Sequence, residues 1–118
     1  MAIALLALAL AGTVSLLASI VIGDSSTIND SFNSWAFGQS NDITSSTQTG
    51  VLGGFNQVSN SAGSMVQGSN NTVTGGVGAL VSGALNTVDN SNLAMVLGAR
   101  NSVANSATNV VIGSDNAL

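Results

Sequence analysis

The sequence predicts a mainly β fold, a parallel β-solenoid (β-roll) of fifteen-residue coils that follows a hydrophobic N-terminal α-helix. Three observations predict this fold. A glycine recurs every fifteen residues without insertion or deletion, aliphatic residues stand two places before and five places after each glycine, and Asn, Ser and Thr fill about half of the remaining places. Such a repeat is too short for a helical hairpin, which needs about 33 to 47 residues, and suits one coil of a β-solenoid.

Each repeat is numbered here from its glycine, position 0, which we expect at a corner of the coil because glycine allows positive φ or close approach of a neighbouring backbone. The corner glycines are Gly23, Gly38, Gly53, Gly68, Gly83, Gly98 and Gly113. We expect aliphatic residues at positions −2 and +5 to fill the interior of the coil. The valines among them are Val21, Val51, Val58, Val66, Val73, Val81, Val88, Val96, Val103 and Val111.

The first strand of each coil is expected at positions −3 to −1, as in residues 95–97, and the second at +3 to +5, as in residues 101–103. Position +3 is asparagine in every repeat except the first, which has Ser26, so stacked coils would form an amide ladder along the axis. Position +8 is serine in most repeats, and the turns around it are rich in Asn and Ser, which bond their own backbone.

Side chains at positions −3 and −1 must point out of the coil if position −2 points in, because strand side chains alternate between faces. These positions are mostly apolar, and a strand that is apolar on both faces is expected to be buried on both. We therefore expect an interface between chains, probed by replacing Met95 or Leu97 with Asp. The expected interface residues are Ile22, Trp35, Phe37, Leu52, Met65, Leu80, Met95, Leu97, Val110 and Ile112.

Two domains are expected: residues 1–19 as a hydrophobic helix for assembly or anchoring, and residues 20–118 as a β-solenoid of about seven repeats. The first segment is rich in Ala and Leu, which form helices readily. An uncharged helix that is apolar all round must enter lipid or be enclosed by protein. Helices 3–18 of several chains could pack as the axial core of a fibre, or residues 1–22 could be a membrane anchor, although no basic residue flanks them.

Composition argues against nucleic-acid binding and catalysis. Arg100 is the single basic residue, so the chain lacks the positive patch that nucleic acid requires. There is no His, Cys, Glu or Lys, and the five aspartates fall at different places in the repeat, so we expect no enzyme, no metal site and no cofactor. Trp35 is either a ligand platform or a cap on the −3 column, and Arg100 either contacts a partner or is solvated.

Residues 94–106 and 109–117 resemble the head repeat of trimeric autotransporter adhesins of the YadA-like type, which reads roughly Ser-Val-Ala-Ile-Gly, two variable residues, Ser or Asn, and an aliphatic residue. The resemblance extends over residues 20–118, and similar repeats occur in some phage fibres. It implies a left-handed parallel β-roll assembled as a trimer around an apolar centre.

Two functions are expected from these features. The first is a structural subunit of a self-assembling homo-oligomeric fibre, extracellular or on a virion, with the helix as its assembly core and the β-roll as a rigid shaft or head. The second is cell adhesion, as an adhesin or receptor-binding tip that is tethered by its N-terminal helix and binds a cell-surface ligand. The expected partners are therefore further copies of the chain and, for the tip, a surface ligand.

Overall fold

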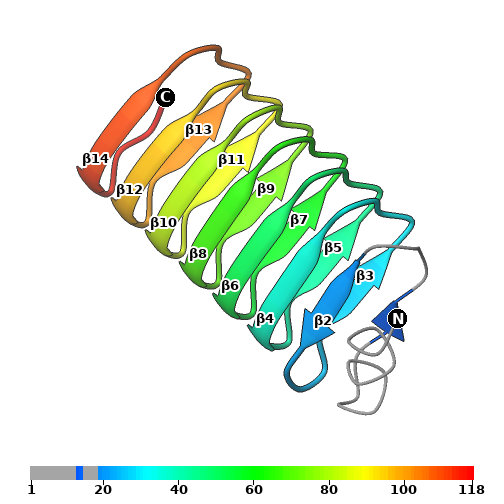
Figure 1. Cartoon of the computed structure of the whole chain (residues 1–118). Helices are drawn as coiled ribbons and strands as arrows, with labels where there is room; N and C mark the ends of the chain where they lie inside the picture. The colour runs from blue at the N-terminus through cyan, green and yellow to red at the C-terminus, as the bar shows by residue number, and fades with distance from the viewer. Residues whose placement is uncertain (1–12, 15–18) are drawn as a thin grey trace.

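A computed structural model describes residues 13–14 and 19–118, which form two parallel seven-stranded sheets (Figure 1). The long-strand sheet contains β2 (Ile20–Ile22), β4 (Trp35–Gln39), β6 (Gly50–Gly54), β8 (Met65–Ser69), β10 (Leu80–Ala84), β12 (Met95–Ala99) and β14 (Val110–Ser114). The short-strand sheet contains β1 (Thr13–Val14), β3 (Thr27–Asn29), β5 (Asp42–Thr44), β7 (Gln57–Ser59), β9 (Thr72–Thr74), β11 (Thr87–Asp89) and β13 (Ser102–Ala104). The expected parallel β-solenoid is confirmed.

Equivalent residues of successive coils lie side by side in both sheets. Val81 of β10 pairs with Val66 on one side and Val96 on the other, so the fifteen-residue period of the sequence becomes the register of the sheet. The first coil departs from this register. Thr13 of β1 pairs with Thr27, which is fourteen residues later (27 − 13).

Three bends in each coil have left-handed backbone, and none of them is at the repeating glycine. In one coil the bends are at Arg100, Asn105 and Thr108, with φ of 54°, 52° and 57°. Gly98 lies inside β12, which runs from position −3 to +1, and the second strand begins at +4 instead of +3. The prediction of a corner at the glycine was therefore wrong by two residues.

The glycine is required for a different reason, which is the close approach of the next coil. Gly98 has φ of 134°, and a Cβ built on it would lie 1.8 Å from the carbonyl oxygen of Gly113. The glycines of the five preceding coils are in similar contact. A side chain at this position would push two coils apart, which is why the glycine recurs in every repeat.

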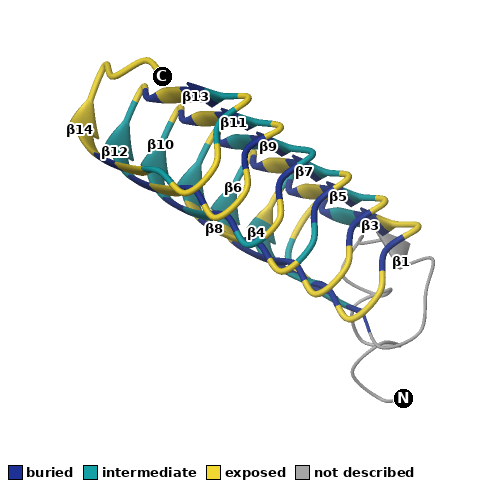
Figure 2. Ribbon diagram, turned by 90° about the horizontal axis from the view of Figure 1, so that it is seen from above, coloured by how far each residue is buried: buried dark blue, intermediate teal, exposed yellow. Residues whose placement is uncertain are grey.

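Buried residues recur in successive coils along the solenoid (Figure 2). They form both apolar and polar columns. All ten valines expected inside are buried, and the most exposed, Val111, retains 5% of its accessible surface. Ile28, Ile43 and Ala36 occupy the same columns. Buried Ser, Thr and Asn at positions −4, +3 and +8 separate these aliphatic columns.

The expected helix of residues 1–19 falls almost wholly outside the described residues, and the part that is described is not helical. Thr13 and Val14 form β1, which pairs with β3, and Ser19 is buried with its Oγ donating to the carbonyl oxygen of Ser31. Parallel coil packing thus begins before the expected boundary at residue 20. Among the described residues no helix is long and apolar enough to cross a membrane.

Candidate functional site

Within residues 19–117 the exposed large hydrophobic side chains lie on the outer face of the long-strand sheet, at the bends at positions +2 and +10, and at position +9, where Phe32 and Val77 stand in a short bridged segment next to the +10 bend. We call this surface the apolar side. Within residues 19–117 its exposed large members are Ile22, Phe32, Leu52, Phe55, Met65, Val77, Leu85, Leu93, Met95, Val110 and Ile112. The outer face of the short-strand sheet carries none of them.

The ten residues expected at an interface all lie in long strands, on either side of a buried residue at position −2. Leu52, Met65 and Met95 are exposed by 43%, 47% and 38%. Leu80 and Leu97 are half-buried by their neighbours in the sheet. The single chain therefore leaves a partly covered apolar surface along the sheet.

Trp35 is packed against its own chain. Its ring lies over Gly50 of the next coil, where an added Cβ would come within 2.3 Å of Trp35 Cζ2. It also contacts Phe37, with ring centroids 5.0 Å apart and planes tilted by 35°. Trp35 therefore covers the −3 column at Gly50, where the column has no side chain. This is the second of the two alternatives expected for Trp35, a cap on the −3 column.

The opposite, short-strand face is polar. Thr27 Oγ1 and Thr44 Oγ1 both donate to Asp42 Oδ1, at 2.6 and 3.2 Å, and Ser59 Oγ donates to Thr74 Oγ1 at 3.4 Å. The Thr27–Asp42 and Ser59–Thr74 contacts join neighbouring coils, whereas the Thr44–Asp42 contact lies within β5. The two faces of the solenoid thus differ sharply in polarity.

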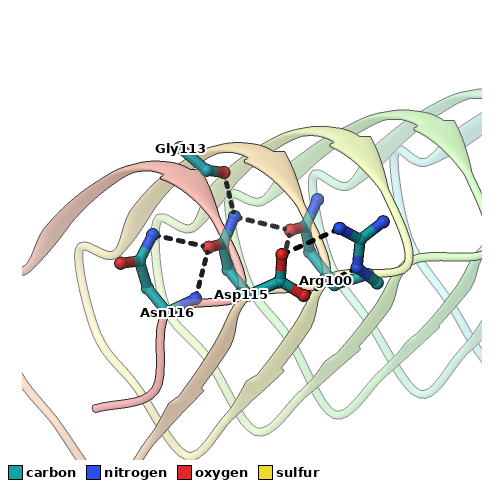
Figure 3. A network of polar contacts seen from close by, with 6 residues as sticks. Arg100, Gly113, Asp115 and Asn116 are labelled. Carbon is teal, nitrogen blue, oxygen red and sulfur yellow. Dashed lines mark hydrogen bonds and ion pairs between the residues drawn. The ribbon is translucent and has the colours of Figure 1, made fainter.

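The asparagines at position +3 form the expected ladder inside the coil. Asn71 Nδ2 donates to Asn56 Oδ1 at 3.0 Å and to the carbonyl oxygen of Gly83 at 2.9 Å. Asn71 Oδ1 accepts from both the backbone N–H and the Nδ2 of Asn86, each at 3.0 Å. The same contacts recur to the last coil, where Figure 3 shows Asn116 and the carbonyl of Gly113. From Asn41 to Asn101 a buried amide therefore satisfies the backbone where the chain leaves the sheet at this bend.

At the other two bends, columns of buried hydroxyl groups at positions +8 and −4 satisfy backbone groups in the same way. Ser46 Oγ donates to the carbonyl of Thr44 at 2.8 Å and accepts from the N–H of Ser61 at 3.2 Å. At position −4, Ser34 Oγ accepts from the N–H of Thr49 at 3.3 Å. The sequence reading missed this second column, although Ser or Thr stands at −4 in the first four coils. Each bend is thus a left-handed residue followed by an inward position, which has a hydroxyl or amide in most coils but is Gly76, Ala79 or Ala94 in three places.

Arg100 makes a two-pronged ion pair with Asp115, the equivalent residue of the next coil (Figure 3). Its Nε and Nη2 lie 2.7 and 2.8 Å from the two carboxylate oxygens. Hydrogen bonding to Arg100 lowers the pKa of Asp115, and hydrogen bonding to Asp115 raises the pKa of Arg100. Both side chains are more than half exposed, so solvent screens the pair.

The fold and its surfaces define a class of protein: a parallel β-solenoid with one apolar side, one polar face and a hydrogen-bonded interior. Within the described residues, acidic side chains form no cluster of three that could hold a metal ion. Comparison of the chain with protein-family models, with curated proteins and with solved structures found no match. The resemblance to YadA-like head repeats therefore stays a prediction that rests on the repeat pattern.

Proposed function

We propose that this chain is a structural, non-catalytic subunit of a self-assembling homo-oligomeric fibre, located outside the cell or on a virion. The observation that carries this proposal is the apolar side, which extends from Ile22 in β2 to Ile112 in β14. Exposed contiguous patches of this kind mark interaction surfaces in soluble proteins. The interior ladders support a shaft, because hydrogen bonds between successive coils resist bending and slippage.

Self-association would remedy the thin core of the single chain. Each coil buries about two aliphatic side chains, which contribute roughly 1.5 to 3 kcal/mol each. Covering Leu52, Met65 and Met95 would add apolar burial that the monomer lacks. A surface with one basic residue and few carboxylates also presents little like-charge repulsion against a second copy.

The test of the proposal is the assembly state of the chain in solution. Sedimentation velocity of the unmodified protein is expected to show an oligomer, and Met95→Asp is expected to dissociate it because an unpaired carboxylate would be buried. The matched control is Thr87→Asp on the polar face, where Asp42 already occupies the same column. A monomeric unmodified chain, or equal dissociation by both variants, would refute the proposal.

The polar face supports a second candidate, an adhesin or receptor-binding tip, because hydroxyl, amide and carboxylate side chains fill the outer positions of β3 to β13 except at Ala104. Electron microscopy separates the two functions: long uniform filaments favour the fibre, and discrete short spikes favour the tip. The role of residues 1–19 is tested in the same images. Their deletion is expected to leave soluble oligomers that no longer extend, whereas unchanged fibres would make the segment an anchor.

A further inference from the structure

The coil that contains β14 has the surface of an interior coil, although no described strand pairs with the outer edge of β14. Val110 and Ile112 are exposed by 66% and 70%, whereas Met95 in β12, which β14 borders, is exposed by 38%. Terminal repeats of solenoids have a polar outer face, and edge strands are protected by charge or proline. The sequence of β14 has neither feature. This end of the solenoid is therefore suited to one more strand.

Polar groups of this coil also lack partners among the described residues. In the coils before it, the amide at position +3 donates to the carbonyl of the next glycine, as Asn101 Nδ2 does to Gly113 at 2.8 Å. Within the described part of the chain, Asn116 Nδ2 donates only to Asn101 Oδ1, at 2.9 Å. Asn109 Nδ2 is buried and has no partner there. A parallel strand beyond β14 would bring backbone carbonyl groups to these amides.

The glycine at position 0 is required in one direction only. A Cβ at this position faces the carbonyl of the following coil, as a Cβ on Gly98 would face Gly113 at 1.8 Å, so only the earlier of two stacked coils needs glycine. A Cβ on Gly113 would meet only Asn116 Nδ2, at 3.5 Å. The space beside Gly113 is therefore open to a carbonyl group, and the residue that supplies this carbonyl can have a side chain.

Residues 6–9, which lie outside the described residues, have a sequence that suits this place. Val14 pairs with Ile28 at position +5, and this pairing numbers the residues before it. By that count positions −3 to 0 are Leu6, Ala7, Leu8 and Ala9. Alternation of large and small residues is typical of a strand. Large residues at −3 and −1 continue the outer columns, and a buried alanine already stands at −2 in Ala36.

This segment does not fit β2 of its own copy. Ala9 would precede Gly23 there, and its Cβ would meet the Gly23 carbonyl as a Cβ on Gly23 would meet that of Gly38, at 1.8 Å. No residue from 1 to 11 is glycine. The segment cannot reach β14 of its own copy either, because β1 and β14 lie at opposite ends of a molecule 42 Å long (Figure 1). The stretch from Val14 back to Ala9 spans at most about 18 Å.

We propose that residues 6–9 of a second copy add to β14 as a further parallel strand, so that copies join end to end. This inference rests on the proposed homo-oligomer and deepens it, because the contact joins a strand edge at the end of the solenoid and needs no packing between sheet faces. The leucines of the added strand cover Val110 and Ile112, and its alanine at position −2 closes the interior above Val111. Addition of an extended segment to an open sheet edge is a common mode of peptide recognition.

Disulfide cross-linking tests the contact, because the chain has no cysteine. Equivalent residues of adjacent strands have Cα atoms about 5 Å apart, which a disulfide can bridge. Co-expressed Leu8→Cys and Ile112→Cys chains are expected to form a linked dimer of one copy of each under mild oxidation. Leu52→Cys in place of Ile112→Cys is the matched control, in the same column at the middle of the solenoid, and is expected to form none.

A charge on the added strand gives a second test. Ala7→Asp would place a carboxylate above Val111 and is expected to abolish the linked dimer, whereas Ala4→Asp, which lies outside residues 6–9, is expected to retain it. Retention of the dimer in Ala7→Asp would overturn the inference.

Other occupants of the β14 edge give different products. Equal linkage of Leu8→Cys to Leu52→Cys and to Ile112→Cys would overturn the inference, as would linkage between two Ile112→Cys chains. An internal disulfide in the Leu8→Cys/Ile22→Cys double variant would place the segment on β2 of its own copy and would also overturn it. If sedimentation shows an oligomer, these results overturn the inference alone. A monomeric unmodified chain would overturn the proposed function as well.

Discussion

Asn71→Ala removes the middle of the asparagine ladder and tests whether buried amides hold the coils together. The Asn71 side chain is fully buried between Asn56 and Asn86. Its truncation leaves the backbone N–H of Asn86 and the carbonyl of Gly83 without the partners that lie 3.0 and 2.9 Å away. Each unsatisfied buried group costs about 1 to 3 kcal/mol, so we expect the free energy of unfolding to fall by about 2 to 5 kcal/mol.

The first coil provides an internal comparison, because Ser26 occupies the same position. Ser26 Oγ donates to the carbonyl of Gly38 at 3.1 Å and accepts from the backbone N–H of Asn41 at 3.1 Å. One hydroxyl thus makes both essential bonds. Asn71→Ser is expected to cost only about 1 to 2 kcal/mol, since the contacts between amides are lost while the backbone groups stay paired.

The assay is urea unfolding followed by circular dichroism at one fixed protein concentration, since association also contributes to stability. Asn70→Ser is the matched control: Asn70 is exposed, and Ser40 has the same left-handed conformation at the equivalent place. Its effect is expected to lie within about 0.5 kcal/mol. An equal fall in the free energy of unfolding for Asn71→Ala and Asn71→Ser would refute the argument, because it would show that side-chain bonds to these backbone groups do not stabilise the fold.

Three further outcomes are expected. Gly68→Ala should prevent folding, since its Cβ would lie 1.8 Å from a carbonyl oxygen of the next coil, whereas Gly54→Ala, whose Cβ meets nothing nearer than 3.6 Å, should fold normally by circular dichroism. Arg100 lowers the pKa of Asp115, so the ion pair stabilises the fold at neutral pH. This stabilisation is lost as acid protonates the Asp115 carboxyl below about pH 4. Asp115→Asn should remove this pH dependence from acid-unfolding curves. Ala79→Ser should raise the free energy of unfolding by about 0.5 to 1.5 kcal/mol by extending the hydroxyl ladder at position −4, as urea titration would show.

The periodic part of the fold was predictable from the sequence because stacking makes each coil repeat its neighbour. The valine columns and the asparagine ladder follow from side-chain alternation and a constant period, and both are where the sequence placed them. The outward apolar residues followed from the same alternation. The ion pair of Arg100 was not predicted. The aspartates were compared only with one another, although Asp115 stands at the same repeat position as Arg100 one coil earlier.

The bends were decided by tertiary structure. Phe55, Leu85 and Leu93 have φ of 59°, 58° and 52°, a conformation that bulky residues rarely adopt and that no local preference would predict. Hydrogen bonds to the coils on either side impose it, as when the N–H of Leu85 donates to the carbonyl of Ser69 at 3.0 Å. The amino-acid sequence by itself determined the period, the interior and the apolar columns. Only the packed coils decided where the chain turns, why the glycine is needed, and that the apolar side includes the flanking bends, because these depend on contacts between residues about fifteen apart.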